Sequence, residues 1–314
     1  MIRYLTAGVK HAFGLYRPGR RVPVRPDDIL LASYPNSGNT WMRFLIANLV
    51  HPDREVSYGN LHQLVFDPDV SVKRDFDRAP RPRIVKTHGS FDPRYRRVIY
   101  LVRDPRDVAL AQYQRLRQLR SIGDEFSLDN FIERFLAGGD AVSLVSTDHF
   151  GSWGENAGSW LAARSRHPGF LWLRYEDLLA DAARELTRVA EFAGLPETTE
   201  RISQAVARSA PDKITDSEKE QGRDVPLVPS AKSGGWRSDL PKPLVARIEA
   251  AWGDIMACLG YELVTRDSHS ALESSLLGLL AVGAAGSTGE QREEALVGDT
   301  SERAGLSAER TTAR

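Results

Sequence analysis

The chain alternates short apolar runs with longer stretches whose apolar residues recur at helical spacing. Apolar-cored runs predict strands at residues 29–32, 83–88, 97–102 and 170–175. Helical spacing follows in segments that begin at Trp41, Val108 and Ala182. Strands and helices that alternate in this way are typical of an α/β fold, with a mostly parallel central sheet covered by helices on both faces.

The rest of the chain is less regular. Further helices are predicted at 126–136, from within 151–160, and at 241–262. Residues 51–82 mix Pro, Asp and Arg with isolated apolar residues, and indicate a loop-rich insertion with one short helix. We expect 211–235 to be an irregular, mobile segment that orders over a bound ligand.

The turn between the first strand and the first helix favours an anion. Its sequence is Asn36-Ser37-Gly38-Asn39-Thr40. The first backbone N–H groups of a helix have no partners within the helix, and the helix dipole adds positive charge there. Gly38 allows close approach of a ligand, and the two hydroxyls add donors. The alternative is an ordinary capped connection between strand and helix.

Polar residues also end the second and third strands. Lys86 and His88 point the same way because side chains alternate along a strand, and Arg103 follows the third strand. Ligands of parallel α/β sheets bind at the carboxyl ends of strands. These residues are therefore candidates for binding or catalysis, whereas elsewhere on a surface each would simply be exposed.

Charge and cysteine content narrow the classes of partner and compartment. Lys+Arg and Asp+Glu are equal at 42 each, which gives no overall positive field for nucleic acid. The single cysteine, Cys258, excludes an intramolecular disulfide or a cysteine-based metal cluster, and fits a reducing, cytoplasmic location. We expect neither a signal peptide nor a transmembrane segment, since the longest apolar run, 276–285, is shorter than the ~20 residues of a bilayer span.

The two ends of the chain differ from its centre. Residues 1–26 form a basic leader without an acidic residue until Asp27, suited to a solvated segment or to contact with a membrane surface or an acidic partner. Residues 263–314 are rich in Ser, Gly, Ala, Glu and Arg, and we expect a disordered tail. The predicted domain is 27–262. No feature of the sequence indicates an oligomeric state.

Several motifs resemble those of one family. YPNSGNTW at 34–41 resembles the 5′-phosphosulfate loop of the PAPS-dependent sulfotransferases, usually YPKSGTTW or YPKSGNTW. VKTH at 85–88, VRDPRDVALAQY at 102–113 and LRYEDLLADAARELTRVAEFAGLP at 173–196 follow in the family's order, and GGWRSDL at 234–240 resembles its closing block. The resemblance implies a P-loop-like three-layer sandwich. The loop is not a Walker A sequence, because no Lys follows Gly38.

The resemblance also implies roles for individual residues. The donor would be PAPS (3′-phosphoadenosine 5′-phosphosulfate), PAP the product, and the acceptor a small molecule or carbohydrate bearing a hydroxyl, or an amine. His88 would be the general base and Lys86 would stabilise charge on the sulfuryl group and the leaving phosphate. No metal would be needed, because fixed cations supply the positive charge. Donor binding would fall to Asn36, Ser37, Gly38, Asn39, Thr40, Trp41 (against the adenine), Arg103 (on the 3′-phosphate), Tyr175 (near the adenine), Ser209 and Lys232.

The sequence departs from the family pattern at several of these places. Asn36 replaces the usual loop Lys, and Ala111 and Ala210 replace a Ser and a Phe that contact the donor. Pro229-Ser230-Ala231 replaces an Arg-Lys-Gly block, which leaves Lys232 or Arg106 to compensate. Three hypotheses follow: an active sulfotransferase, a degenerate relative that binds a nucleotide or partner without turnover, and a P-loop kinase-like phosphotransferase.

Overall fold

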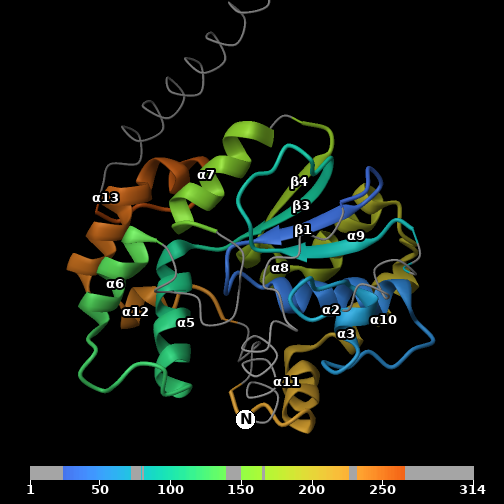
Figure 1. Ribbon diagram of the computed structural model, residues 1–314, viewed down its shortest axis with the longest axis horizontal. Coiled ribbons are helices and arrows are strands. Elements are labelled where there is room, and N and C mark those ends of the chain that lie inside the picture. The colour runs from blue at the N-terminus through green and yellow to red at the C-terminus, as the bar shows by residue number, and fades with distance from the viewer. Residues whose placement is uncertain are drawn as a thin grey trace, which may run out of the picture.

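The computed structural model describes residues 24–71, 79, 81–138, 150–164, 167–225 and 232–265 (Figure 1). Apart from 24–26 and 263–265, the predicted leader and tail lie outside these residues. The described helices and strands are β1 (Ile29–Ser33), α2 (Asn39–Val50), α3 (Leu61–Leu64), β2 (Ile84–Thr87), β3 (Arg97–Val102), α5 (Pro105–Gln118), α6 (Leu128–Ala137), α7 (Trp153–Arg164), β4 (Phe170–Arg174), α8 (Tyr175–Ala180), α9 (Ala182–Ala193), α10 (Thr199–Arg208), α11 (Pro211–Glu220), α12 (Trp236–Asp239) and α13 (Lys242–Cys258).

The described strands form one parallel sheet in the order β2-β1-β3-β4. The chain leaves β1 to build β2 on one side and then returns to build β3 on the other. The carboxyl ends of β1 and β3 therefore lie at a topological switch point, where the connections diverge and open α/β sheets bind their ligands.

Helices cover both faces of this sheet, which confirms the predicted three-layer α/β fold. Leu30 and Ala32 face a core built with α5, α6, α7 and α13, whereas Ile29 and Leu31 face a second core built with α2, α9 and α10 (Figure 1). All five residues of β1 are buried, so a continuous apolar run was its sequence signature. The four predicted strands are all present.

Capping residues set the helix boundaries near the strand ends. The Asp104 side chain accepts a hydrogen bond from the backbone N–H of Arg106, and Pro105 occupies the first turn, so α5 begins three residues before the predicted Val108. Gly38 caps α2 with φ of 95°. Trp153 and Trp160 of α7 are fully buried and belong to the core on that face of the sheet.

The segment before β2 extends the sheet beyond its edge. The backbone N–H of Phe66 donates to the carbonyl of Ile84 at 2.9 Å, and the N–H of Lys86 donates to the carbonyl of Phe66 at 2.8 Å. Phe66 forms an isolated parallel bridge with Val85. Residues that follow Phe66 are thereby held beside the carboxyl end of β2. The short helix predicted in the loop-rich region 51–82 is α3.

The prediction of an irregular segment over 211–235 is wrong for its first part. Residues 211–220 form the helix α11, on which Ile214 and Glu218 are buried. Only two side chains of this helix turn inward, which is too few to give a visible apolar period. Residues 226–231 lie outside the described residues, and the predicted last helix is observed as α13, shorter at its C-terminal end.

A buried ion pair joins the starts of β1 and β2. Arg83 Nε donates to Asp28 Oδ1 at 2.7 Å, and both side chains are at most 2% exposed. Removing one charge of a buried pair leaves the other uncompensated.

We therefore expect Asp28→Asn to lower the free energy of unfolding by about 3–5 kcal/mol, measured by urea denaturation. Asp129→Asn is the matched control, because Asp129 pairs with Arg247 on the surface and such pairs contribute about 0–1 kcal/mol. Equal effects of the two substitutions would contradict the assignment of Asp28 as a structural anchor.

Candidate active site

The loop after β1 presents backbone donors at the start of α2. Asn36 and Gly38 both adopt positive φ, 62° and 95°, and so turn the chain sharply before the helix. Ser37 is fully buried, and its Oγ has no hydrogen-bond partner among the described residues. A buried hydroxyl without a partner next to a helix N-terminus fits a site that binds an anion.

The ring of Tyr175 packs directly on this loop. A Cβ atom added to Gly38 would lie 2.6 Å from Tyr175 Cδ2, which is closer than two carbons can approach. Tyr175 opens α8 at the end of β4, and burial raises its pKa. The Trp41 ring meets the Tyr175 ring edge-on, with centroids 6.1 Å apart. Glycine is therefore required at 38 both for the backbone conformation and for this contact.

Arg103 connects the loop after β1 to the segment that precedes α12. Its guanidinium carbon lies 4.5 Å from the centroid of the Tyr175 ring. Nη1 donates to the carbonyl of Asn36 and Nη2 to the carbonyl of Lys232, both at 3.0 Å. The structure thus brings together four predicted site residues from distant parts of the chain: Asn36, Arg103, Tyr175 and Lys232.

Trp41 and Ser209 also lie together. Trp41 Nε1 donates to the carbonyl of Ser209 at 3.0 Å, and Asn48 Nδ2 donates to Ser209 Oγ at the same distance. Ser209 is fully buried at the end of α10, which packs on α2. Through Trp41, Ser209 is connected to the cluster formed by Tyr175 and Arg103.

His88 is fixed at the end of β1. Its Nδ1 lies 2.8 Å from the carbonyl oxygen of Ser33, which can only accept, so Nδ1 carries the proton and Nε2 carries the lone pair. Burial, and after it the positive charge of Lys86, lower the pKa of His88 to about 3. The imidazole is therefore neutral at physiological pH, the form needed by a general base.

Asn39 uses its side chain for the scaffold. Its Nδ2 donates to Ser33 Oγ at 3.1 Å and to the carbonyl of Leu31 at 3.3 Å. The amide thus faces β1, and the backbone N–H is what Asn39 can offer to an anion at the helix N-terminus. Thr40, the next residue, is half-buried.

Lys86, two residues before His88, is bound to two carboxylates. Its Nζ lies 3.2 and 3.1 Å from the two carboxylate oxygens of Asp67, and 3.3 Å from Asp69 Oδ2. The sequence did not single out either acid, because residues 51–82 were predicted only as a loop-rich insertion with one short helix. Their place next to Lys86 depends on the backbone pairing of Phe66 with β2, which no local pattern signals.

Two further residues of α5 have roles that the sequence did not reveal. Asp107 accepts hydrogen bonds from the backbone N–H groups of Gly234 (2.6 Å) and Trp236 (3.0 Å), and so fixes the closing block. Arg106 is fully buried and pairs with Asp104 and Glu249. The suggestion that Arg106 compensates for missing donor contacts is therefore wrong.

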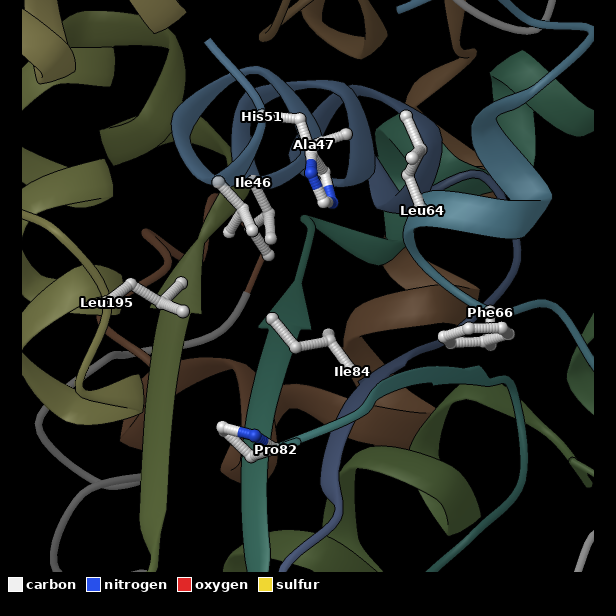
Figure 2. Close-up of a pocket in the computed structure, with 9 residues that line it drawn as sticks. Ile46, Ala47, His51, Leu64, Phe66, Pro82, Ile84 and Leu195 are labelled. Atoms are coloured by element: carbon white, nitrogen blue, oxygen red, sulfur yellow. The ribbon is translucent and has the colours of Figure 1, made fainter. Parts of the chain in front are cut away.

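A small apolar cavity lies elsewhere, between the C-terminal end of α2 and the start of β2 (Figure 2). Its lining includes Ile46, His51, Leu64, Ile84 and Leu195. None of the predicted site residues lines it. Among the described residues, no group of His, Cys, Asp or Glu side chains is arranged to hold a metal ion, and no helix is long and apolar enough to span a bilayer.

We expect Gly38→Ala to destabilise the protein more than Gly194→Ala. Both glycines have positive φ, but an added Cβ meets Tyr175 at 38 and meets nothing within 4 Å at 194. The backbone cost, about 1–2 kcal/mol, is common to both, so the difference in the midpoint of thermal unfolding reports the contact with Tyr175. Equal losses would show that the ring moves aside freely.

Comparison with known proteins gives the family. A family model described as the sulfotransferase domain matches residues 26–260. Rat sulfotransferase 1A1 is 32% identical over 191 residues, 55% of this chain and 62% of that protein. Mouse sulfotransferase 2B1 is 29% identical over 221 residues, 65% of this chain and 62% of that protein. The chain thus spans about 62% of the length of these two relatives.

Solved structures agree in fold. Retinol dehydratase in complex with androsterone and the inactive cofactor PAP matches with a TM-score of 0.58 at 21% identity, over 75% of this chain and 82% of that one. A mouse sulfotransferase complexed with PAP matches with a TM-score of 0.57 at 20% identity, over 74% of this chain and 84% of that one. Since the family model covers well over half of the sequence, this chain belongs to the sulfotransferase domain family.

Proposed function

We propose that this protein transfers a sulfuryl group from PAPS to an acceptor hydroxyl or amine, with His88 as general base. One observation carries the proposal: His88 is hydrogen-bonded to the last residue of β1, from which the anion-binding loop starts. This bond holds a neutral imidazole at the end of the strand from which the loop continues. The proposed base and the proposed donor site would thus be adjacent, as a transfer between two bound molecules requires.

The proposed donor site uses the cluster around Gly38. The backbone N–H groups at the start of α2 and the buried Ser37 hydroxyl would hold the 5′-phosphosulfate, together with Asn36, Asn39 and Thr40. Support for this role comes from the unsatisfied Ser37 Oγ, because buried polar atoms normally have a partner.

Arg103 would hold the 3′-phosphate of the donor. Two of its nitrogens donate to backbone carbonyls in the structure, but a guanidinium has five N–H groups, and Nε lacks a partner among the described residues. Trp41 and Tyr175 would provide aromatic surfaces for the adenine, and Ser209 and Lys232 would border it. The positions of Ser209 and Lys232, one hydrogen bond from Trp41 and Arg103 respectively, support this assignment.

The proposed transfer forms one bond to sulfur and breaks another. The acceptor oxygen gives its proton to Nε2 of His88 and forms a bond to sulfur. The bond from sulfur to the bridging phosphate oxygen breaks, and its electron pair stays on that oxygen, so PAP leaves. Lys86 would stabilise the negative charge that develops there. The proposed acceptor is a hydroxyl-bearing small molecule or carbohydrate, and the proposed site of action is the cytoplasm.

Replacement of His88 tests this function. We expect His88→Ala to reduce kcat/KM for transfer of labelled sulfate from PAPS by about 10²–10⁴-fold, on a panel of alcohols, phenols and sugars, while calorimetry shows unchanged binding of PAP. His167→Ala, at an exposed residue before β4, is the matched control. Binding of PAP without any transfer by the wild type would favour a degenerate relative, and Mg²⁺-dependent use of ATP would favour a kinase.

The pH dependence of the rate gives a second test. Because burial holds the pKa of His88 near 3, far below its ordinary 6.5, the base stays unprotonated as the pH falls through the neutral range. The acid limb of kcat/KM should therefore lie well below pH 6.5, with no loss between about pH 8 and 6. A limb centred near the ordinary value would mean that His88 is solvated, or is not the base.

A further inference from the structure

The ammonium group of Lys86 already has three carboxylate contacts. Its Nζ lies 3.1 and 3.2 Å from the two oxygens of Asp67 and 3.3 Å from one oxygen of Asp69. An ammonium has three N–H donors, so these contacts use all of them. For Lys86 to reach an oxygen of a transferring sulfuryl group, one contact has to be given up.

Asp67 is held firmly by its other contacts. Arg43 Nη1 lies 3.2 Å from Asp67 Oδ2, and Arg43 Nη2 donates to the carbonyl of Val65. The Arg43 and Asp67 side chains are only 7% and 8% exposed. Phe66, immediately before Asp67, is hydrogen-bonded to Ile84 and Lys86 along the outer edge of β2. Withdrawing Asp67 would leave a buried arginine unpaired, which is strongly unfavourable.

Asp69 is held less tightly to Lys86. It reaches Nζ through one oxygen, at the longest of the three distances, and its side chain is 17% exposed. It lies in the turn after Asp67, and the next residue, Val70, is 52% exposed. A rotation of this side chain toward solvent would free one N–H of Lys86 without breaking the buried pair.

We infer that Asp67, fixed by Arg43, is a positioning residue that holds Lys86 for the transfer, and that Asp69 is a displaceable contact whose place on Nζ a sulfuryl oxygen of the donor takes. The exchange replaces one anionic oxygen by another, so the local charge stays balanced. This inference rests on the proposed function and adds a pair of acids to the residues of that site.

The same carboxylate acts on the base. Burial lowers the pKa of His88 most, and the charges of Lys86 and Arg43 lower it as well, whereas the backbone carbonyl of Ser33 and the charge of Asp67 raise it. Removing the negative charge of Asp67 would therefore lower the pKa of His88 further. Loss of packing without loss of charge would not shift the acid limb of the rate profile, so a downward shift reports the charge of Asp67.

Calorimetry with PAPS and with PAP separates these roles, because only PAPS carries the sulfuryl group. We expect Asp69→Asn to raise the affinity for PAPS several-fold more than the affinity for PAP, since the anion that it removes occupies the place of a sulfuryl oxygen. Asp67→Asn should weaken binding of PAPS relative to binding of PAP and lower kcat by about 10- to 100-fold. It should also move the acid limb of kcat/KM to lower pH. Asp67→Glu, which keeps the negative charge, should partly restore these properties. Asp129→Asn controls for loss of a surface acid.

The outcomes are distinct. If the wild type binds PAPS and transfers sulfate, but Asp69→Asn leaves the ratio of PAPS to PAP affinity unchanged, the inference is overturned and the proposed function stands. If the wild type binds neither nucleotide, the donor is wrong and both fall. Should Asp67→Asn fail to fold in a thermal scan, the affinity ratio of Asp69→Asn still decides the question, because that side chain is partly exposed.

Discussion

The contact of the Tyr175 ring with Gly38 and Arg103 holds the candidate site together. Tyr175 follows β4, Gly38 follows β1 and Arg103 follows β3, so one ring connects three strand ends. The ring lies against a position without a side chain on the loop and beneath a guanidinium that is hydrogen-bonded to the same loop. The shape of the anion-binding turn therefore depends on packing that arrives from residues more than sixty positions away.

The parallel sheet supplies the second half of the arrangement. Because side chains alternate along β2, Lys86 and His88 emerge on the same side of the strand end. His88 is tied to the neighbouring strand through the carbonyl of Ser33, whereas Lys86 is tied outward to Asp67 beyond the sheet edge. The proposed base and the proposed charge stabiliser are thus held from opposite sides, with the loop of β1 next to the base.

The sequence predicted the scaffold well and the contacts of the site poorly, for a physical reason. Apolar runs and caps are local, so the strands and the turn at Gly38 could be recognised. The contacts of Lys86 with its acidic partners, and the hydrogen bond from Gly234 to Asp107, depend on pairings between distant segments. The helix α11 was missed because a helix that buries only Ile214 and Glu218 has almost no apolar period.

The replacement of the loop Lys by Asn36 changes where positive charge can act in the proposed reaction. Asn tolerates the left-handed conformation better than most residues, and at φ of 62° its carbonyl accepts a hydrogen bond from Arg103. The loop loses a cation, whereas its hydrogen bond to Arg103 uses the backbone and does not depend on the side chain at 36. Of the two predicted site cations at the ends of β2 and β3, Arg103 is assigned to the 3′-phosphate, so Lys86 alone would balance the leaving phosphate. A site that depends on one ammonium needs it held in place, which is the task that the buried carboxylate of Asp67 can perform.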